Sequence, residues 1–167
     1  MDAGTTPLLE RILGFLDGIG VAVREQPIDE PTFLPGIRVT GGALVFDRTR
    51  LDWPADLLHE AAHVALTSAA RRPALDDALQ AEPPDAVGEV EAIAWSFAAA
   101  TRLGVPLGQL FHAGGYRGQS HGLALSYSLG VYVGVAGLAA LDLCAVGAEA
   151  QRLGVRPYPH MLRWLRD

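Results

Sequence analysis

Apolar side chains recur at helical spacing in several parts of the chain, most clearly between residues 55 and 70. Neither glycine nor proline interrupts this stretch, and its apolar positions lie three or four residues apart: Leu58, Ala61, Ala62, Ala65 and Leu66. This spacing places them on one broad face of a helix. Asp52, Trp53 and Pro54 indicate the helix start, because proline is tolerated at the first helical position, where its missing N–H costs nothing. The pattern predicts a helix over residues 55–70 with one buried face.

The same reasoning predicts a small sheet before this helix and further helices around it. Short apolar runs bounded by glycine and proline predict strands at residues 21–24, 36–39 and 43–47. Helical spacing predicts helices at residues 7–16, 83–103, 107–111, 123–148 and 159–165. We therefore expect an α+β fold, in which a small N-terminal sheet packs on the helix at 55–70 and a mainly helical second half follows.

One apolar stretch raises the question of a membrane. Residues 123–141 carry no charge, and the stretch is long enough to cross a bilayer. It is rich in glycine, serine and tyrosine, however, Asp142 follows it at once, and it lacks basic flanks that would set an orientation. We expect a buried core helix here rather than a membrane span, with Tyr127 and Tyr132 as core residues whose hydroxyl groups find partners.

Composition limits the class of protein. With 167 residues, 50% hydrophobic and 19% charged, the chain is expected to form a single domain over residues 1–167 with a substantial core. A net charge of −6 and 13 scattered basic residues argue against a nucleic-acid partner, because phosphate binding requires clustered Lys and Arg. The single cysteine, Cys144, excludes an intramolecular disulfide and is expected to be a small buried hydrophobe. The N-terminus lacks the basic and apolar regions of a signal peptide, which predicts a cytoplasmic location.

The predicted helix at 55–70 carries a candidate metal site. His59, Glu60 and His63 form an HExxH sequence, and one helical turn places the two imidazoles side by side. Two histidines at this spacing are the usual half of a zinc site, and the glutamate beside them accepts a proton from the water that zinc activates. Two alternatives stay open. The motif arises by chance in about one in a hundred chains of this composition, and the histidines can be ordinary residues of an alanine-rich helix.

A zinc site needs a third protein ligand, and the predicted helix at 83–103 offers Glu89 and Glu91. If Val90, Ile93 and Phe97 define the apolar face of that helix, Glu89 lies nearer to this face than Glu91 does. We therefore expect Glu89 to bind the metal. Glu91 would then hold a ligating histidine or point to solvent.

The order of sheet, HExxH helix and an ExEA segment that starts at Glu89 and leads to Phe-Ala resembles the IrrE/ImmA-like metallopeptidases over residues 20–103. This resemblance implies a zinc-dependent peptidase of the gluzincin type with a small α+β core, often found cutting regulatory proteins. By matching positions, the two histidines of the motif would be zinc ligands, Glu60 the general base, and Glu89 or Glu91 the third ligand. The asparagine that commonly follows the ExEA segment in that family is Ile93 here.

Residues around a glycine-rich loop at 112–118 are candidates for stabilising the oxyanion that forms when the activated water attacks a carbonyl group. The candidates are His112, Tyr116, Arg117 and His121. The alternative is an ordinary surface loop with a packing tyrosine. His160, near the end of the chain, is expected to be structural.

Together these features predict a zinc-dependent hydrolase, and we expect a peptidase acting on a peptide or protein. Glu60 would deprotonate water held on zinc, while zinc polarises the scissile carbonyl. Two other hypotheses stay open, a non-catalytic metal-binding regulatory module and a zinc enzyme acting on a small molecule. An edge strand parallel to the HExxH helix, with free N–H and C=O groups, would favour peptides, because they bind by strand addition.

Overall fold

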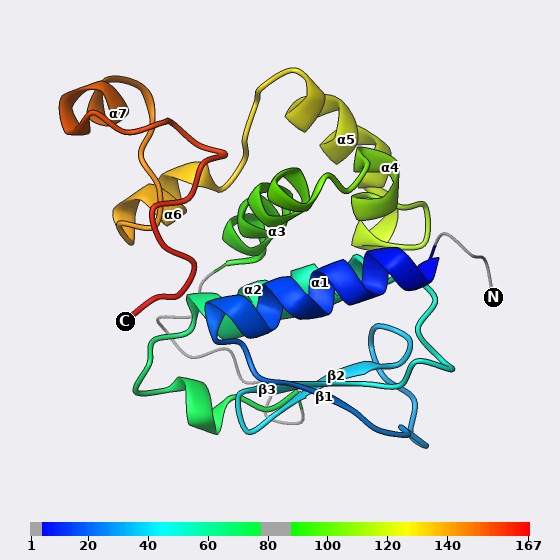
Figure 1. The fold of residues 1–167 in the computed structure, drawn as a ribbon. Helices are drawn as coiled ribbons and strands as arrows, with labels where there is room; N and C mark the ends of the chain where they lie inside the picture. Colours follow the sequence, from blue (N-terminus) through cyan, green and yellow to red (C-terminus); the bar gives the residue numbers. More distant parts are fainter. Residues whose placement is uncertain (1–4, 78–87) are drawn as a thin grey trace.

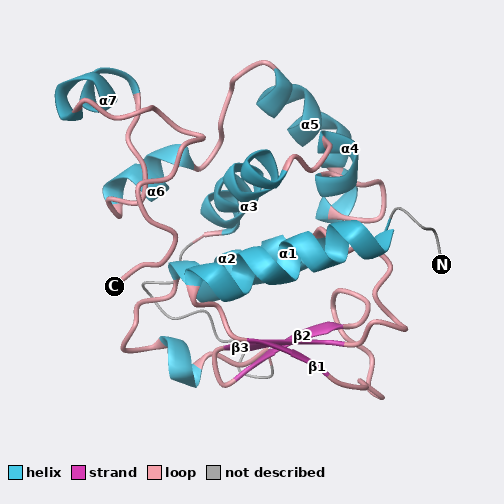
Figure 2. Cartoon of the chain, in the orientation of Figure 1, coloured by secondary structure: helices cyan, strands magenta, loops and turns pink. Residues whose placement is uncertain are grey.

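The computed structural model describes residues 5–77 and 88–167 of the chain. Strands form a thin layer on one side of the molecule, and helices are stacked on one face of that layer (Figure 2). The helix start predicted at Pro83 lies outside the described residues. The observed arrangement confirms an α+β fold with a small sheet near the N-terminus and a mainly helical second half.

The sheet contains β1 (Val23–Glu25), β2 (Ile37–Thr40) and β3 (Ala43–Phe46) in the spatial order β1-β3-β2. The central strand β3 is parallel to β1 and antiparallel to β2. Gly41 and Gly42 form the tight turn between β2 and β3, with φ angles of 58° and 73°. Positive φ at both central positions is what a two-residue hairpin turn requires, and glycine adopts it without steric cost.

In the described part of the chain, seven α-helices accompany this sheet (Figure 1). α1 and α2 lie across the face of the sheet, and α3 packs on them from the opposite side. The smaller helices complete the second half of the molecule. The bounds are α1 (Thr5–Ile19), α2 (Asp56–Leu66), α3 (Glu89–Leu103), α4 (Leu107–Leu110), α5 (Ser120–Ser128), α6 (Val135–Ala140) and α7 (Gly147–Leu153), with short 3₁₀ helices η1 (Arg72–Ala74) and η2 (Tyr116–Gly118).

Close packing of α2 against α3 forms the centre of the core. Ala61, Ala62 and Ala65 of α2 are fully buried, as are several alanines of α3. Small side chains let the two helices approach, so that the hydroxyl of Ser96 on α3 donates to the carbonyl oxygen of Leu58 on α2 at 3.3 Å. A buried apolar cluster joins these helices to α1, to the sheet and to the C-terminal segment. α2 therefore packs against α1, α3, the sheet and the C-terminal segment.

The C-terminal residues return to the end of α2. The backbone N–H of Arg166 donates to the carbonyl oxygen of Ala65 at 2.9 Å, and the guanidinium of Arg72 donates to the carbonyl oxygen of Arg166 at 2.7 Å. The last carbonyl groups of a helix have no partner within the helix, so the first of these bonds satisfies one of them. The indole N–H of Trp95 on α3 donates to the carbonyl oxygen of Trp164 at 2.9 Å. The tail thus connects α2 and α3.

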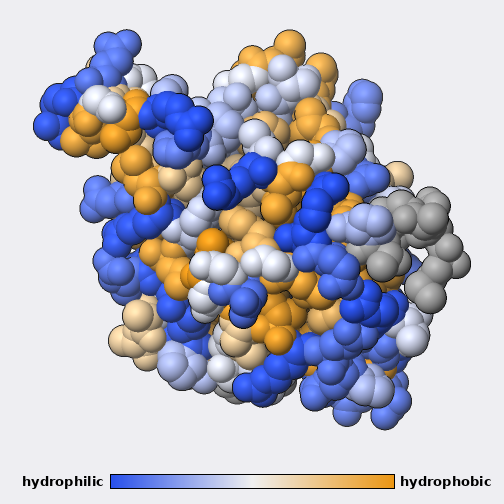
Figure 3. Space-filling view, in the orientation of Figure 1, coloured by the Kyte–Doolittle hydropathy of each residue, from blue (hydrophilic) through white to orange (hydrophobic). Residues whose placement is uncertain are grey.

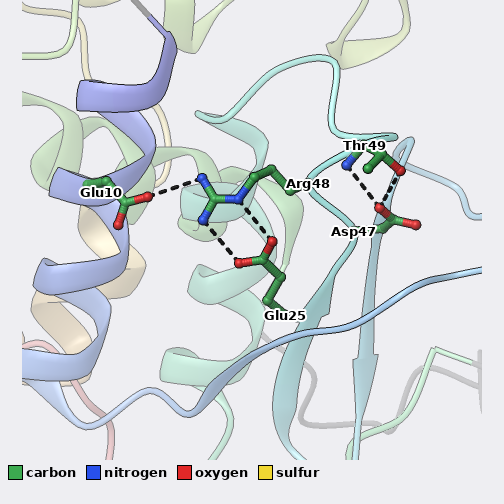
Figure 4. Close-up of polar contacts among 5 residues, drawn as sticks. All are labelled: Glu10, Glu25, Asp47, Arg48 and Thr49. Carbon is green, nitrogen blue, oxygen red and sulfur yellow. Dashed lines mark hydrogen bonds and ion pairs between the residues drawn. The ribbon is translucent and has the colours of Figure 1, made fainter. Parts of the chain in front are cut away.

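Arg48, which follows β3, connects the sheet to α1 (Figure 4). Its guanidinium donates to the two carboxylate oxygens of Glu25 on β1 at 2.9 and 3.0 Å, and to Glu10 on α1 at 3.1 Å. The neighbouring Asp47 accepts hydrogen bonds from the N–H and hydroxyl of Thr49 at 2.9 and 2.7 Å. Solvent-exposed ion pairs contribute at most about 1 kcal/mol each, so these contacts orient the elements more than they stabilise the fold.

The prediction of one long buried helix at residues 123–148 is wrong. The structure has two short helices there, α5 and α6, because the chain turns at Gly130 and Gly134 with φ angles of 77° and 88°. Leu129, between them, is 71% exposed. Apolar side chains are visible over the end of α5, at the top of Figure 3. Within residues 5–77 and 88–167, no helix is both long and apolar enough to cross a membrane.

Two other helix predictions need correction. α2 ends at Leu66 rather than at residue 70, because Thr67 adopts an extended backbone and its hydroxyl donates to the carbonyl oxygen of His63 at 2.7 Å. Residues 159–165 are not helical. Instead, Met161 pairs with a residue of an earlier segment in an isolated β-bridge.

The predicted burial of single residues holds for two of three cases. Cys144, the bridge partner of Met161, is buried, and burial raises the pKa of its thiol to about 11. Tyr127 is buried, and its hydroxyl donates to a backbone carbonyl oxygen at 2.6 Å. Tyr132 is only half-buried, because it lies in the turn between α5 and α6 rather than inside a long core helix.

Replacing Gly134 by Ala is expected to lower the free energy of unfolding by about 3 kcal/mol or more. An added Cβ would overlap the carbonyl oxygen of Val90 on α3, and the positive φ adds strain. Gly130→Ala is the matched control, because its φ is also positive but nothing lies within 4 Å of the added atom. We expect a loss of about 1–2 kcal/mol there. Urea unfolding measures both values, and equal losses would contradict the close approach of Gly134 to α3.

Candidate metal centre

His59 and His63 lie one turn apart on α2, and their Nε2 atoms are 3.3 Å from one another. The two rings meet edge to face, with centroids 5.0 Å apart and an interplanar angle of 85°. His59 is buried and His63 is half-buried. The helical period alone accounts for their proximity, and α2 presents both rings at the border of the core.

The first residue of α3 completes a cluster of three groups that can bind a metal. One carboxylate oxygen of Glu89 lies 3.0 Å from Nε2 of His59, and the other lies 3.5 Å from Nε2 of His63. Glu89 stands at the head of a stripe of buried residues at helical spacing: Ala92, Ile93, Ser96, Ala99 and Ala100. Because this stripe packs on α2, it directs the carboxylate towards the histidines. The ligand atoms of all three residues lie within 4.8 Å of one another.

Glu91 lies outside this cluster. The apolar face of α3 does not include Val90, which is 41% exposed, and the buried residues of the helix begin at Ala92. The side chain of Glu91 packs against α6 instead, where a Cβ atom at Gly137 would overlap its carboxylate. The structure thus brings Glu89 next to the two histidines, and the expectation that Glu89 binds a metal stays a prediction.

The three donor atoms fit a zinc ion in spacing and in chemistry. Zinc binds imidazole nitrogen and carboxylate oxygen at about 2.0–2.2 Å in a tetrahedron, which separates neighbouring ligand atoms by about 3.3 Å. The two Nε2 atoms are 3.3 Å apart, and the two oxygens of Glu89 lie 3.0 Å from Nε2 of His59 and 3.5 Å from Nε2 of His63. Three protein ligands leave a position for water or substrate, as in catalytic zinc sites, whereas structural sites use four.

Burial and neighbouring charges shift the pKa values of the titratable groups at the site. Hydrogen bonds from His59 and His63 hold the pKa of Glu89 well below its ordinary value. Burial lowers the pKa of His63, but the hydrogen bond to Glu89 and the charges of Glu60 and Asp77 raise it by more. Burial raises the pKa of Glu60, and the nearby imidazoles offset this only in part. Glu60 therefore accepts a proton more readily than an exposed glutamate does, which suits a general base.

The ring of Tyr116 packs against His59 of the same cluster. The two rings meet edge to face, with centroids 5.6 Å apart. The hydroxyl is buried and has no hydrogen-bond partner among the described residues. Burial, together with the charges of Asp56 and Glu89, raises the pKa of Tyr116 above its ordinary value, so the hydroxyl keeps its proton. A φ of 55° is uncommon for a residue other than glycine, and such strain is concentrated at functional sites.

His112 is bound by an aspartate of α2 rather than by the cluster. Its Nε2 lies 2.8 Å from a carboxylate oxygen of Asp56, and both side chains are buried. The imidazole also stacks on the indole of Trp53, with centroids 4.3 Å apart and an interplanar angle of 7°. The hydroxyl of Ser120 donates to the carbonyl oxygen of His112 at 2.6 Å. His112 thus anchors the loop that carries Tyr116 to the first turn of α2.

The other candidates from the loop lie at the surface. His121 is exposed in the first turn of α5, and Arg117 is exposed in η2. In the part of the chain that the structure describes, neither belongs to the metal-binding cluster. His160 is half-buried. Asp56 was not identified from the sequence as a residue near the site. Its position one turn before His59 places it on the same side of α2, and this spacing can be read from the sequence.

The outer edge of β2 is paired with another segment of the chain. The N–H of Val39 donates to the carboxylate of Asp77 at 2.6 Å, and the N–H of Asp77 donates to the carbonyl oxygen of Val39 at 3.1 Å. The N–H of Gly42 donates to the carbonyl oxygen of Leu75 at 2.9 Å. The free edge that would favour peptide substrates is therefore occupied here. No local pattern marks Asp77, because its partner is far away in the sequence.

Comparison of the chain with protein families, with curated proteins and with solved structures finds no match. The resemblance to IrrE/ImmA-like metallopeptidases therefore stays a prediction from the motif residues.

Proposed function

We propose that the protein is a zinc-dependent hydrolase, in which His59, His63 and Glu89 hold the metal. One observation carries the proposal. The two imidazole Nε2 atoms lie 3.3 Å apart, and each lies 3.0 or 3.5 Å from one of the two carboxylate oxygens of Glu89; the half-buried carboxyl group of Glu60 belongs to the same turn of α2. This is the arrangement that hydrolysis by an activated water requires.

The residues around the metal ligands have separate tasks in this mechanism. His59, His63 and Glu89 would hold a zinc ion, which would supply a Lewis acid and would lower the pKa of water to near neutrality. Glu60 accepts a proton from the attacking water and can return it to the leaving group. The buried hydroxyl of Tyr116 donates a hydrogen bond to the oxyanion of the attacked carbonyl. His112 and Asp56 hold the loop that positions this hydroxyl.

Two substrate classes follow from the site. The HExxH motif with a downstream glutamate favours hydrolysis of a peptide bond, as in the metallopeptidases that the chain resembles. A small carbonyl compound is the second candidate, and the occupied edge of β2 favours it, because a peptide cannot add to a strand whose N–H and C=O groups are already paired.

Metal content and turnover test the proposal together. We expect about one zinc per chain and slow hydrolysis of fluorescein-labelled α-casein or of a small acyl anilide, which a chelator removes and zinc restores. The double variant His59→Ala/His63→Ala should lose both metal and turnover. The control His121→Ala/His160→Ala removes the same number of histidines outside the cluster and should retain both. Zinc that survives the first double variant would refute the site, and stoichiometric zinc without turnover would favour a non-catalytic metal-binding module.

A further inference from the structure

We infer that the turn between α5 and α6 attaches the protein to the surface of a lipid bilayer, where its exposed aliphatic side chains enter the boundary between headgroups and acyl chains. Such an attachment lies in the plane of the interface and needs no helix that crosses the membrane. The inference is independent of the proposed function, because the turn contributes no residue to the metal-binding cluster of His59, His63 and Glu89.

Large aliphatic side chains protrude at this turn. In the part of the chain that the structure describes, ten large hydrophobic residues are exposed, and four of them lie within nine consecutive positions: Leu125, Leu129, Val131 and Val133. Their exposed fractions run from 42% to 71%. α5 lies on the side of the molecule away from the sheet, and apolar side chains gather over its end (Figure 1, Figure 3). Single exposed hydrophobic residues are ordinary on a protein surface, whereas a group of them marks a contact site.

The polar groups at the tip of the turn are already paired within the chain. The N–H groups of Leu129, Gly130 and Val131 donate to carbonyl oxygens of α5 at 3.1, 3.2 and 2.9 Å. The hydroxyl of Ser128 donates to the carbonyl oxygen of Leu125 at 2.7 Å. A polar group that enters an apolar medium without a partner is strongly unfavourable. The turn can therefore enter the lipid without leaving these donors unpaired.

The distribution of charge selects the kind of partner. Residues 103–141 contain only one of the chain's 32 charged side chains, Arg117, and the whole chain has a net charge of −6. Every exposed residue among positions 129–133 is Leu, Val or Gly, whereas a protein–protein interface has a polar rim and about one hydrogen bond per 100–200 Å². An anionic membrane repels an acidic protein. An uncharged aliphatic surface on an acidic protein therefore fits a zwitterionic bilayer, such as one of phosphatidylcholine.

The end of α5 also forms one wall of an apolar groove of about 480 Å³. The side chains that line it include Phe97, Val105, Leu107 and Tyr127. A cavity of about 150 Å³ already holds a benzene-sized molecule. The groove therefore has room for the end of an acyl chain beside the inserted turn.

Co-sedimentation of the whole chain with phosphatidylcholine vesicles tests the inference. We expect the wild type to partition onto these vesicles, without loss at raised salt concentration, and to partition more weakly when the vesicles contain phosphatidylglycerol. Leu129→Glu should lower the partition coefficient by at least about tenfold, because burial of a leucine is lost and a charge opposes insertion. Phe33→Glu is the matched control. Phe33 is 77% exposed in the loop between β1 and β2, its replacement changes the net charge equally, and partitioning should stay unchanged.

Two further measurements separate attachment to lipid from other effects of the substitutions. Both replaced side chains are exposed, so urea unfolding should give wild-type stability for Leu129→Glu and Phe33→Glu. Leu129→Ser adds no charge and should still weaken partitioning, by up to about tenfold. Absence of vesicle binding by the wild type, or an equal loss in Phe33→Glu, overturns the inference. If the wild type binds no vesicles but forms dimers in sedimentation equilibrium that Leu129→Glu dissociates, the turn is an interface between copies of the chain and the lipid assignment fails.

Discussion

Zinc affinity is expected to fall by more than about a hundredfold when Glu89 is replaced by Ala, because a ligand that contacts both histidines is lost. Removing a residue that only hydrogen-bonds a metal ligand costs about 10–100-fold, and the loss of a ligand should exceed this. The two carboxylate oxygens of Glu89 lie 3.0 and 3.5 Å from the nitrogens of His59 and His63. Competition with a chromogenic chelator gives the dissociation constants.

Glu91→Ala is the matched control for this measurement. The two glutamates lie two residues apart in the same helix, yet the carboxylate of Glu91 packs at Gly137 of α6. Its replacement should change zinc affinity by less than about tenfold. A larger loss in Glu91→Ala than in Glu89→Ala would show that the wrong carboxylate has been assigned to the metal.

Glu60→Gln should reduce turnover by about 10²–10⁴-fold and leave zinc content unchanged, because the amide keeps the shape of the side chain but cannot accept a proton. The effect should lie in kcat rather than in KM, since Glu60 acts on the attacking water and not on substrate binding. Steady-state hydrolysis by the zinc-loaded protein measures it. Glu10→Gln, on α1 and outside the site, should keep the wild-type rate. Near-normal kcat in Glu60→Gln at full zinc occupancy would exclude this residue as the base.

The parts of the site that depend on one helix could be predicted from the sequence. The separation of His59 and His63 is fixed by the helical period, and the stretch around them is uninterrupted by glycine or proline. The small sheet and its hairpin turn were also predictable, because Gly41 and Gly42 mark the turn. Short-range geometry determines all of these features, so the identity of neighbouring residues is sufficient to predict them.

The parts that depend on contacts between distant segments could not be predicted. The pairing of His112 with Asp56 joins residues 56 positions apart, and the pairing of Val39 with Asp77 joins residues 38 positions apart. The break between α5 and α6 has the same origin, because Gly134 is required by its contact with Val90 on another helix. A helical pattern in the sequence carries no information on such an approach.

The return of the C-terminal tail to α2 determines which segments of the chain must be transferred together when this site is moved to another protein. A fragment limited to residues 20–103 would contain the whole HExxH motif and Glu89. It would lack the N–H of Arg166, which donates to the carbonyl oxygen of Ala65. It would also lack the carbonyl oxygen of Trp164, which accepts a hydrogen bond from the indole N–H of Trp95. The last turn of α2, which begins at His63, would then have an unsatisfied carbonyl group in a buried setting. Recombination that exchanges only the motif segment would therefore separate the proposed metal ligands from the residues that hold their helices. Grafting the candidate centre into another scaffold would require the tail as well.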